Sequence, residues 1–169
     1  MGGEQAVQTV DDACLIFRTA WVYTLRTSAG SLRQSGFVNK VLDWAHQQET
    51  LRVVSDQVAN PTWARMLAEI TAQVLARGKE YIHERVGLYH LAGGGFTSRF
   101  EWARLILELD PNRHEQMVKE LLPAPTSDFP TPARRPLFSA LNCDKFAATF
   151  GLRLSAWEAA LRMAMDVLK

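Results

Sequence analysis

Short apolar runs alternate along this chain with longer segments in which apolar residues recur at helical spacing. Four apolar runs predict strands, and the first is typical of a strand covered on both faces of a parallel sheet: residues 14–17, 51–54, 86–91 and 117–122. Four segments predict helices: residues 37–45, 61–76, 99–109 and 156–168. Because strands and helices alternate, the pattern favours the α/β class with a mainly parallel sheet.

Capping residues mark the expected starts of three of these helices. Asn60 can cap the second helix, and Pro61 suits its first position, where no backbone donor is missed. Two pairs have the spacing of a capping box: Ser98 with Glu101, and Ser155 with Glu158.

Two stretches are expected to be loops. Residues 24–36 carry Ser, Gly, Arg and Thr with little periodicity, which predicts a surface loop. Residues 123–136 contain five prolines, which predicts a long ordered loop or lid within one domain. With 169 residues and no internal repeat, the chain is expected to form a single domain over residues 1–169.

Charge and cysteine content limit the possible partners and compartments. A net charge of +1 excludes a strong general attraction to nucleic acid or to an anionic membrane. The chain has no run of the roughly 20 apolar residues that a membrane helix needs, and its start lacks the features of a signal peptide. Cys14 and Cys143 are too few for a disulfide scaffold. We therefore expect a cytoplasmic protein with no nucleic-acid and no membrane partner.

The chemically versatile residues show no catalytic or metal-ligating pattern. None of the four histidines has zinc-ligand spacing to another His, Cys or carboxylate, and His90 is expected to be a hydrogen-bonded core histidine. Cys14 lies in an apolar strand, and nothing marks Cys143 as a nucleophile. The residues therefore predict neither a metal site nor a catalytic group.

Two segments are candidates for binding an anion. Gly93-Gly94-Gly95 lies between a predicted strand and a predicted helix, but a plain turn with a helix cap is favoured because Walker and dinucleotide spacing are both absent. Arg134 and Arg135 form the better candidate, since a guanidinium group can bind phosphate oxygens through two parallel hydrogen bonds. The alternative is a solvated pair that caps nearby carbonyls.

Trp21 is the most informative aromatic residue. It follows the predicted strand 14–17, and ligands of α/β proteins bind at the carboxyl ends of parallel strands. Its ring could pack on a sugar or a base, although a buried core tryptophan is equally compatible with this position. The residues alone thus predict an α/β ligand-binding domain with one anion site and one aromatic platform.

Five stretches together resemble the dTDP-4-dehydrorhamnose reductase family of extended short-chain dehydrogenases. They are FRTAWVY at 17–23, DQVANPT at 56–62, GLYHLAG at 87–93, PTSDFPTPA at 125–133, and Arg135-Pro136 with Ser139 and Leu141. The resemblance covers nearly the whole chain. It implies the C-terminal part of a Rossmann-like fold, comprising the end of a parallel sheet and the substrate-binding lobe. The implied reaction reduces the 4-keto group of dTDP-4-dehydro-6-deoxy-L-mannose to dTDP-L-rhamnose with NADPH or NADH.

The resemblance also implies which residues bind the substrate. Trp21 falls on the tryptophan that contacts the deoxysugar, and Arg134 or Arg135 lies in the Arg-Pro segment expected near the diphosphate. Asn60 and Thr62 belong to a motif expected at a strand-to-helix turn beside the cleft.

The chain departs from the family pattern in the residues that carry the chemistry. It has neither the glycine-rich fingerprint for NADPH nor the Tyr-x-x-x-Lys pair, and the resemblance implies that it opens just after that lysine. Alone, it is therefore expected to bind no cofactor and to be inactive.

One alternative is a non-catalytic nucleotide-sugar-binding or regulatory protein, similar to the regulatory subunit of methionine adenosyltransferase. A partner chain or a second copy would then cover the exposed sheet edge. A second alternative is that a protein of the same fold acts on a different nucleotide-linked deoxysugar.

Overall fold

The strands of the protein form short pairs rather than one wide sheet. A computed structural model describes residues 2–10, 14–25 and 36–167, and within them eight strands make four two-stranded pairs. Three pairs are parallel: β1 (Leu15–Arg18) with β6 (Gly87–His90), β2 (Val22–Tyr23) with β5 (Thr62–Trp63), and β3 (Thr50–Val54) with β8 (Glu120–Ala124). The fourth pair is antiparallel and joins β4 (Val58–Ala59) to β7 (Thr97–Ser98). The predicted α/β class with parallel strand pairing is confirmed.

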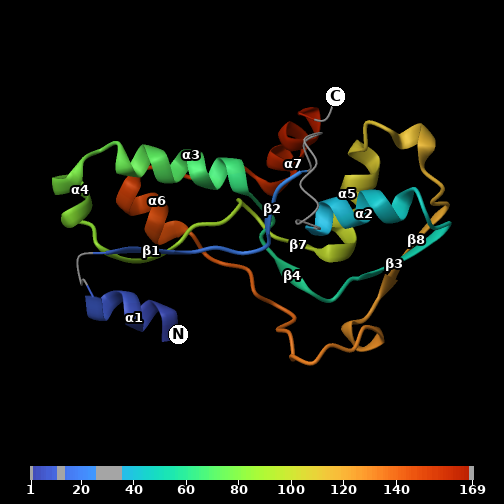
Figure 1. Ribbon diagram of the computed structural model, residues 1–169, viewed down its shortest axis with the longest axis horizontal. Helices are drawn as coiled ribbons and strands as arrows, with labels where there is room; N and C mark the ends of the chain where they lie inside the picture. The colour runs from blue at the N-terminus through green and yellow to red at the C-terminus, as the bar shows by residue number, and fades with distance from the viewer. Residues whose placement is uncertain (1, 11–13, 26–35, 168–169) are drawn as a thin grey trace.

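Helices α2 to α5 lie between strands in the chain, whereas α1 precedes β1 and both α6 and α7 follow β8 (Figure 1). Their bounds are α1 (Gly2–Val10), α2 (Phe37–Ala45), α3 (Ala64–Leu75), α4 (Lys79–His83), α5 (Arg99–Leu109), α6 (Asp144–Phe150) and α7 (Trp157–Asp166). Single 3-10 turns occur at η1 (Arg113–Glu115) and η2 (Thr126–Asp128). No helix in these described parts of the chain is long and apolar enough to cross a membrane.

One of the three predicted helix starts is confirmed and two are wrong. Ser98 caps α5, because its hydroxyl accepts a 3.1 Å hydrogen bond from the Glu101 amide. Asn60 does not cap α3, since Thr62–Trp63 pairs as a strand before the helix begins at Ala64. Ser155 does not cap α7, because its segment pairs with the glycine turn through a 2.9 Å bond from the Gly94 amide to the Ser155 carbonyl.

The strand and loop predictions differ in detail from the structure. The predicted strand 117–122 is displaced: β8 runs to Ala124, and Pro123 pairs with Val53 inside what was expected to be loop. The short helices and two-residue strands were not predicted. Most of the predicted loop 24–36 lies outside the described residues.

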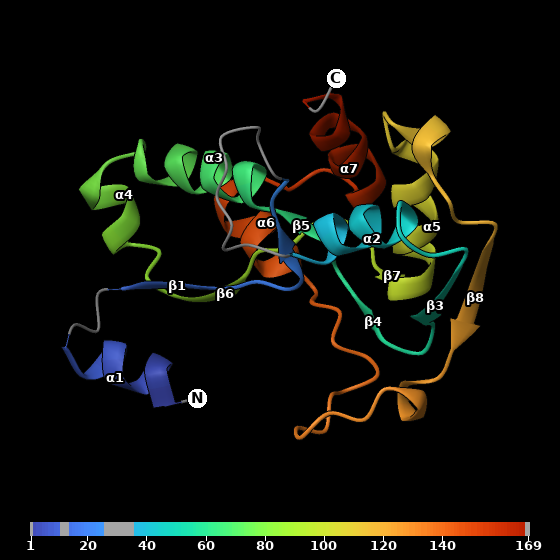
Figure 2. The same cartoon turned by 45° about the vertical axis from the view of Figure 1, so that its right-hand side comes forward.

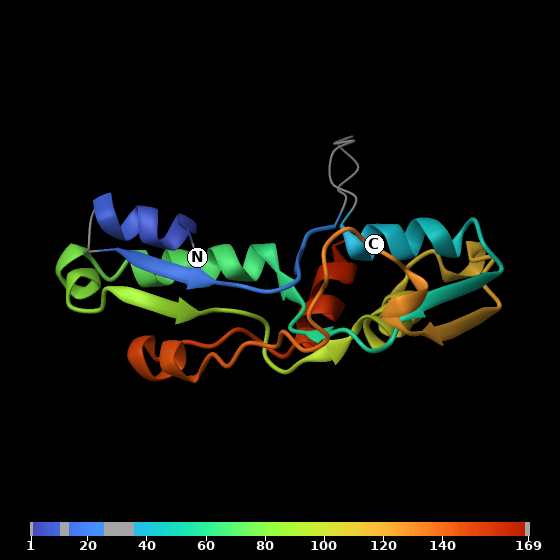
Figure 3. The ribbon, with the colours of Figure 1, turned by 90° about the horizontal axis from the view of Figure 1, so that it is seen from below.

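Two apolar cores lie along the long axis of the molecule (Figures 1 and 3). The first surrounds Trp102 of α5 and is closed by α2, α7 and β3. The second surrounds Phe146 of α6 and is closed by α3, β1 and β6. The segments that join the two cores include Trp21 and the residues before α3, so they carry the candidate site.

Among the described residues, no further strand pairs with β1 on the side away from β6. Helix α1 lies across β1 from α6, has no buried residue, and is tied to β1 by two 2.7 Å hydrogen bonds from Arg18 to Glu4 (Figures 1 and 3). The apolar residues Leu15, Ile16 and Phe17 are only half-buried. The expectation that this strand is covered on both faces is therefore wrong for the chain by itself.

Two polar side-chain atoms of the first core are buried without a hydrogen-bond partner among the described residues. Tyr23 is 2% exposed, and neither its hydroxyl nor the Trp102 indole nitrogen has a hydrogen-bond partner among the described residues. Burial accordingly raises the pKa of Tyr23. In the second core, by contrast, the Tyr89 hydroxyl donates a 2.8 Å bond to the Arg85 carbonyl.

The two buried tyrosines are therefore expected to differ in how replacement by phenylalanine changes the free energy of unfolding. Tyr23→Phe removes a hydroxyl that has no hydrogen-bond partner in the described part of the chain, so the free energy of unfolding is expected to stay level or rise by up to about 1 kcal/mol. Tyr89→Phe removes a satisfied hydroxyl and is expected to lower it by about 1 kcal/mol. Urea unfolding at one protein concentration measures both. A larger loss for Tyr23→Phe than for Tyr89→Phe would contradict the assignment.

Candidate binding site

Trp21 occupies a constrained turn between β1 and β2. Its φ of 38° lies in the left-handed region, which is unfavourable for a bulky side chain and must be held by its surroundings. Its carbonyl accepts a 3.2 Å bond from the Thr62 amide, and its half-buried indole stacks on Trp102 with 5.6 Å between centroids and 8° between planes. Trp21 therefore lies at the edge of the first core, partly supported by it and partly accessible.

Arg99 covers the same aromatic surface. Its guanidinium carbon lies 4.3 Å from the ring centroid of Trp21 and 5.0 Å from that of Phe37, and its Nε donates a 3.4 Å bond to Oε1 of Gln57. Desolvation lowers the pKa of this half-buried guanidinium, and the nearby charge of Arg135 lowers it further. We call this group the aromatic–arginine cluster: Trp21, Phe37, Arg99 and Trp102.

A chain of hydrogen bonds connects the cluster to the proline-rich segment 123–136. The Gln57 amide donates a 3.1 Å bond to the Thr126 hydroxyl. Thr126 in turn donates to Asp56 through its hydroxyl at 2.6 Å and its amide at 3.0 Å, and these bonds lower the pKa of Asp56. Asp56 and Gln57 follow β3, so the chain joins the end of this strand to η2 and to Arg99.

The two arginines expected to bind an anion are both exposed on the proline-rich segment, which lies along the edge of the molecule in Figure 2. Arg135 is close enough to Arg99 to affect its pKa. The fold thus brings Trp21 and Arg99 into contact, and the charge of Arg135 acts on Arg99. The predicted roles of Arg134 and Arg135 in binding substrate stay predictions.

Asn60 and Thr62 are buried beneath this region and support it. The Asn60 side chain donates to the carbonyls of Gly93 at 3.2 Å and Gly95 at 2.6 Å, and it accepts a 2.7 Å bond from the Leu141 amide. The Thr62 hydroxyl accepts a 3.0 Å bond from the Gly93 amide. These bonds give both residues a positioning role, and their predicted contact with substrate stays a prediction.

The glycine turn is a packing feature rather than a phosphate cradle. A Cβ on Gly93 would lie 2.1 Å from the Pro61 carbonyl oxygen, and the Gly94 amide is already bonded to Ser155. The favoured interpretation as a plain turn is confirmed. Because the backbone amides of Gly93 and Gly94 are both occupied, this turn does not fit the diphosphate of NADPH.

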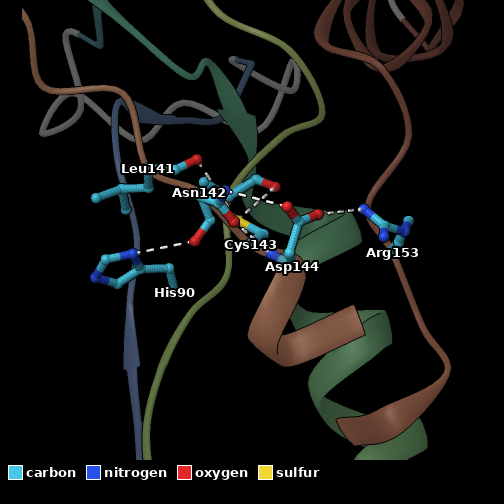
Figure 4. A network of polar contacts seen from close by, with 7 residues as sticks. His90, Leu141, Asn142, Cys143, Asp144 and Arg153 are labelled. Atoms are coloured by element: carbon cyan, nitrogen blue, oxygen red, sulfur yellow. Dashed lines mark hydrogen bonds and ion pairs between the residues drawn. The ribbon is translucent and has the colours of Figure 1, made fainter. Parts of the chain in front are cut away.

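Two hollows occur elsewhere on the described surface. One of about 290 Å³ lies between α5, η1 and β8, and one of about 260 Å³ lies beside the glycine turn and α6. In the second, Asp144 pairs with Arg153 at 3.2 Å (Figure 4). Burial raises the pKa of Cys143, so its thiol stays protonated and is a poor nucleophile. Neither hollow is lined by Trp21, Arg99 or Arg135.

His90 differs from its predicted environment. Its ring is half-buried at the edge of β6, and Nδ1 lies 3.2 Å from the Asn142 carbonyl oxygen (Figure 4). The ring is thus hydrogen-bonded as expected, but its predicted place in the core is wrong because β6 ends there at the surface. No group of three potential metal ligands occurs among the described His, Cys, Asp and Glu residues.

Comparison with known proteins gives this geometry a context. The family model described as "RmlD substrate binding domain" matches residues 1–169. The chain belongs to this family. A dTDP-4-dehydrorhamnose reductase from Salmonella typhimurium is 39% identical over 161 residues, which are 94% of this chain and 50% of that protein. A relative of the same name from Shigella flexneri is 37% identical over 169 residues, 99% of this chain and 54% of its own length.

Solved structures of the family agree with the fold. A dTDP-4-dehydrorhamnose reductase from Clostridium acetobutylicum has a TM-score of 0.80 at 29% identity, covering 98% of this chain and 52% of that one. A Bacillus anthracis relative, solved in complex with NADP, has a TM-score of 0.79 at 26% identity, covering 99% and 52%. The chain therefore spans about half the length of the family members it matches.

Sequence reasoning missed Arg99 and Gln57 as members of the site. The sequence did contain a signal for Arg99. A cation directly after a helix N-cap is opposed by the helix dipole, so arginine is unfavourable there unless its side chain serves another purpose. Gln57 belongs to the motif at 56–62, but only the fold shows that its two ends connect Thr126 and Arg99.

The close approach at Gly93 predicts a sharp dependence of folding on this residue. Gly93→Ala would place a methyl group against the Pro61 carbonyl, so we expect a loss of about 3 kcal/mol or more in the free energy of unfolding. Gly3→Ala is the control, because a Cβ there meets nothing within 4 Å and alanine favours the helix. Thermal and urea unfolding of both variants measure the difference. Equal stabilities would contradict the packing role of Gly93.

Proposed function

We propose that this chain supplies the substrate-binding part of a dTDP-4-dehydrorhamnose reductase. The observation that carries the proposal is the contact of the half-accessible Trp21 ring with the guanidinium group of Arg99, whose pKa is also lowered by the charge of Arg135. An aromatic surface suits the apolar face of a deoxysugar, and guanidinium groups suit a diphosphate. A dTDP-sugar carries both features in one molecule.

The reaction proposed for the whole enzyme reduces the 4-keto group of dTDP-4-dehydro-6-deoxy-L-mannose to dTDP-L-rhamnose. NADPH would supply the hydride, but the glycine turn of this chain does not fit it, and no Tyr in the sequence has a Lys four residues on. This chain's part is to bind and orient the sugar at Trp21 and to neutralise the diphosphate. Alone, it is expected to leave NADPH unoxidised in the presence of the keto sugar.

Titration calorimetry with dTDP-L-rhamnose and with dTDP tests this role. The wild-type chain is expected to bind the sugar-bearing ligand more tightly, and Trp21→Leu is expected to weaken that binding about tenfold with little change for dTDP. Trp63→Leu is the control, since Trp63 is also half-buried but lies outside the aromatic–arginine cluster. Equal affinity of the wild type for both ligands would contradict a sugar platform at Trp21.

A second proposal concerns the open side of β1. The free edge and the half-buried Leu15, Ile16 and Phe17 favour a covering chain, which is a partner or a second copy. The absence of cystine, with Cys14 and Cys143 both free, is in keeping with the cytoplasm as the site of this assembly.

Light scattering coupled to size exclusion tests the second proposal. The purified chain is expected to self-associate as its concentration rises, because the uncovered edge and apolar face can pair with another copy. Ile16→Lys, which places a charge on β1, is expected to shift the distribution toward monomer. A monomer at all concentrations with one cooperative unfolding transition would contradict the need for a covering chain, while supporting a single domain over residues 1–169.

A further inference from the structure

We propose that Arg99 is the principal anion-binding residue of the site, binding the diphosphate of the nucleotide sugar and fixing the orientation of the Trp21 ring. This inference rests on the proposed function and deepens it. It concerns a residue at the first position of α5, outside the Arg-Pro segment that the family resemblance points to.

The charge of Arg99 has no counter-ion among the described residues. The guanidinium is half-buried against Trp21 and Phe37, and it forms no ion pair with a carboxylate in the described part of the chain. Its described polar partner is the neutral Gln57, and the like charge of the exposed Arg135 lowers its pKa. A partly desolvated cation without a counter-ion is unfavourable, and a bound anion removes that cost.

The neighbouring acid, Asp56, does not neutralise Arg99. Asp56 stands one residue from Gln57, yet its carboxylate accepts two hydrogen bonds from Thr126 instead of pairing with Arg99. Thr126 then accepts from Gln57, whose carbonyl oxygen is left for Nε of Arg99. The chain of bonds orients Arg99 without neutralising it. Its two terminal nitrogens have no hydrogen-bond partner among the described residues, and a guanidinium with both free can bind two phosphate oxygens.

Arg99 is also coupled to the indole ring of Trp21. Because the guanidinium carbon lies 4.3 Å from the centroid of that ring, an anion that fixes Arg99 also restricts the indole that is expected to receive the sugar. Lysine at this position would keep the charge but lose the planar stacking and the paired donors.

Titration of dTDP and dTMP into the protein tests the inference. Arg99→Met keeps the apolar stem over the rings and is expected to weaken dTDP binding tenfold or more, with a smaller loss for dTMP because it has one phosphate fewer. Arg99→Lys is expected to recover only part of the affinity. Arg104→Met is the matched control, because Arg104 lies on the same helix, is exposed, and pairs with Glu101 instead of facing the site.

Gln57→Glu tests the charge of Arg99. It keeps an oxygen for Nε of Arg99 and the aromatic contacts, loses the bond that the Gln57 amide donates to Thr126, and supplies a carboxylate beside Arg99. It is expected to weaken dTDP binding several-fold although Arg99 is still present. A purely structural Arg99 would leave dTDP affinity unchanged in this variant.

The outcomes of these titrations distinguish the role of Arg99 from the proposed function on which it rests. Unchanged dTDP affinity in Arg99→Met and Gln57→Glu, with binding of dTDP-L-rhamnose by the wild type intact, would overturn the role of Arg99 alone. A folded wild-type chain that binds neither dTDP nor dTDP-L-rhamnose would overturn the proposed function and the inference with it.

Discussion

The buried side chain of Asn60 is the interaction on which the arrangement of the site depends. It bonds to carbonyls 33 and 35 residues away in the glycine turn and to the Leu141 amide, 81 residues away and just beyond the proline-rich segment. These hydrogen bonds stabilise the fold, because a buried side-chain amide without hydrogen-bond partners would cost about 1–3 kcal/mol. The same contacts bring the turn after β6, the segment before α3 and the stretch leading to α6 to one point, and Trp21 and Arg99 lie beside it.

The acidic groups near Arg99 have other partners, so Arg99 is not neutralised by a described carboxylate. Asp56 accepts hydrogen bonds from Thr126 and Glu101 pairs with Arg104, whereas Arg99 is met by an amide oxygen. The strained backbone of Trp21 and its stacking on Trp102 fix an aromatic ring beside Arg99. Such a grouping suits a ligand with a negative diphosphate and an apolar sugar face better than a purely ionic or a purely apolar ligand.

Local sequence patterns predicted the elements that local forces determine. The stripe of α2 gave its bounds, and Ser98 caps α5 because its partner Glu101 is three residues away. The caps at Asn60 and Ser155 failed because these residues serve distant segments, Asn60 through its side chain and Ser155 through its carbonyl. Likewise Trp21 could be singled out from its place after a strand. Arg99 could not be assigned, because its role depends on its tertiary contacts with Gln57 and Trp21.

The central claim is that a nucleotide sugar binds against Trp21, and the indole N–H signals of the five tryptophans test it most directly. We would titrate ¹⁵N-labelled protein with dTDP-L-rhamnose and follow these signals by two-dimensional NMR. The account predicts that Trp21 shifts strongly and that Trp44, at the far end of α2 from Phe37, stays in place. A bound sugar nucleotide that leaves the Trp21 signal unchanged would contradict it.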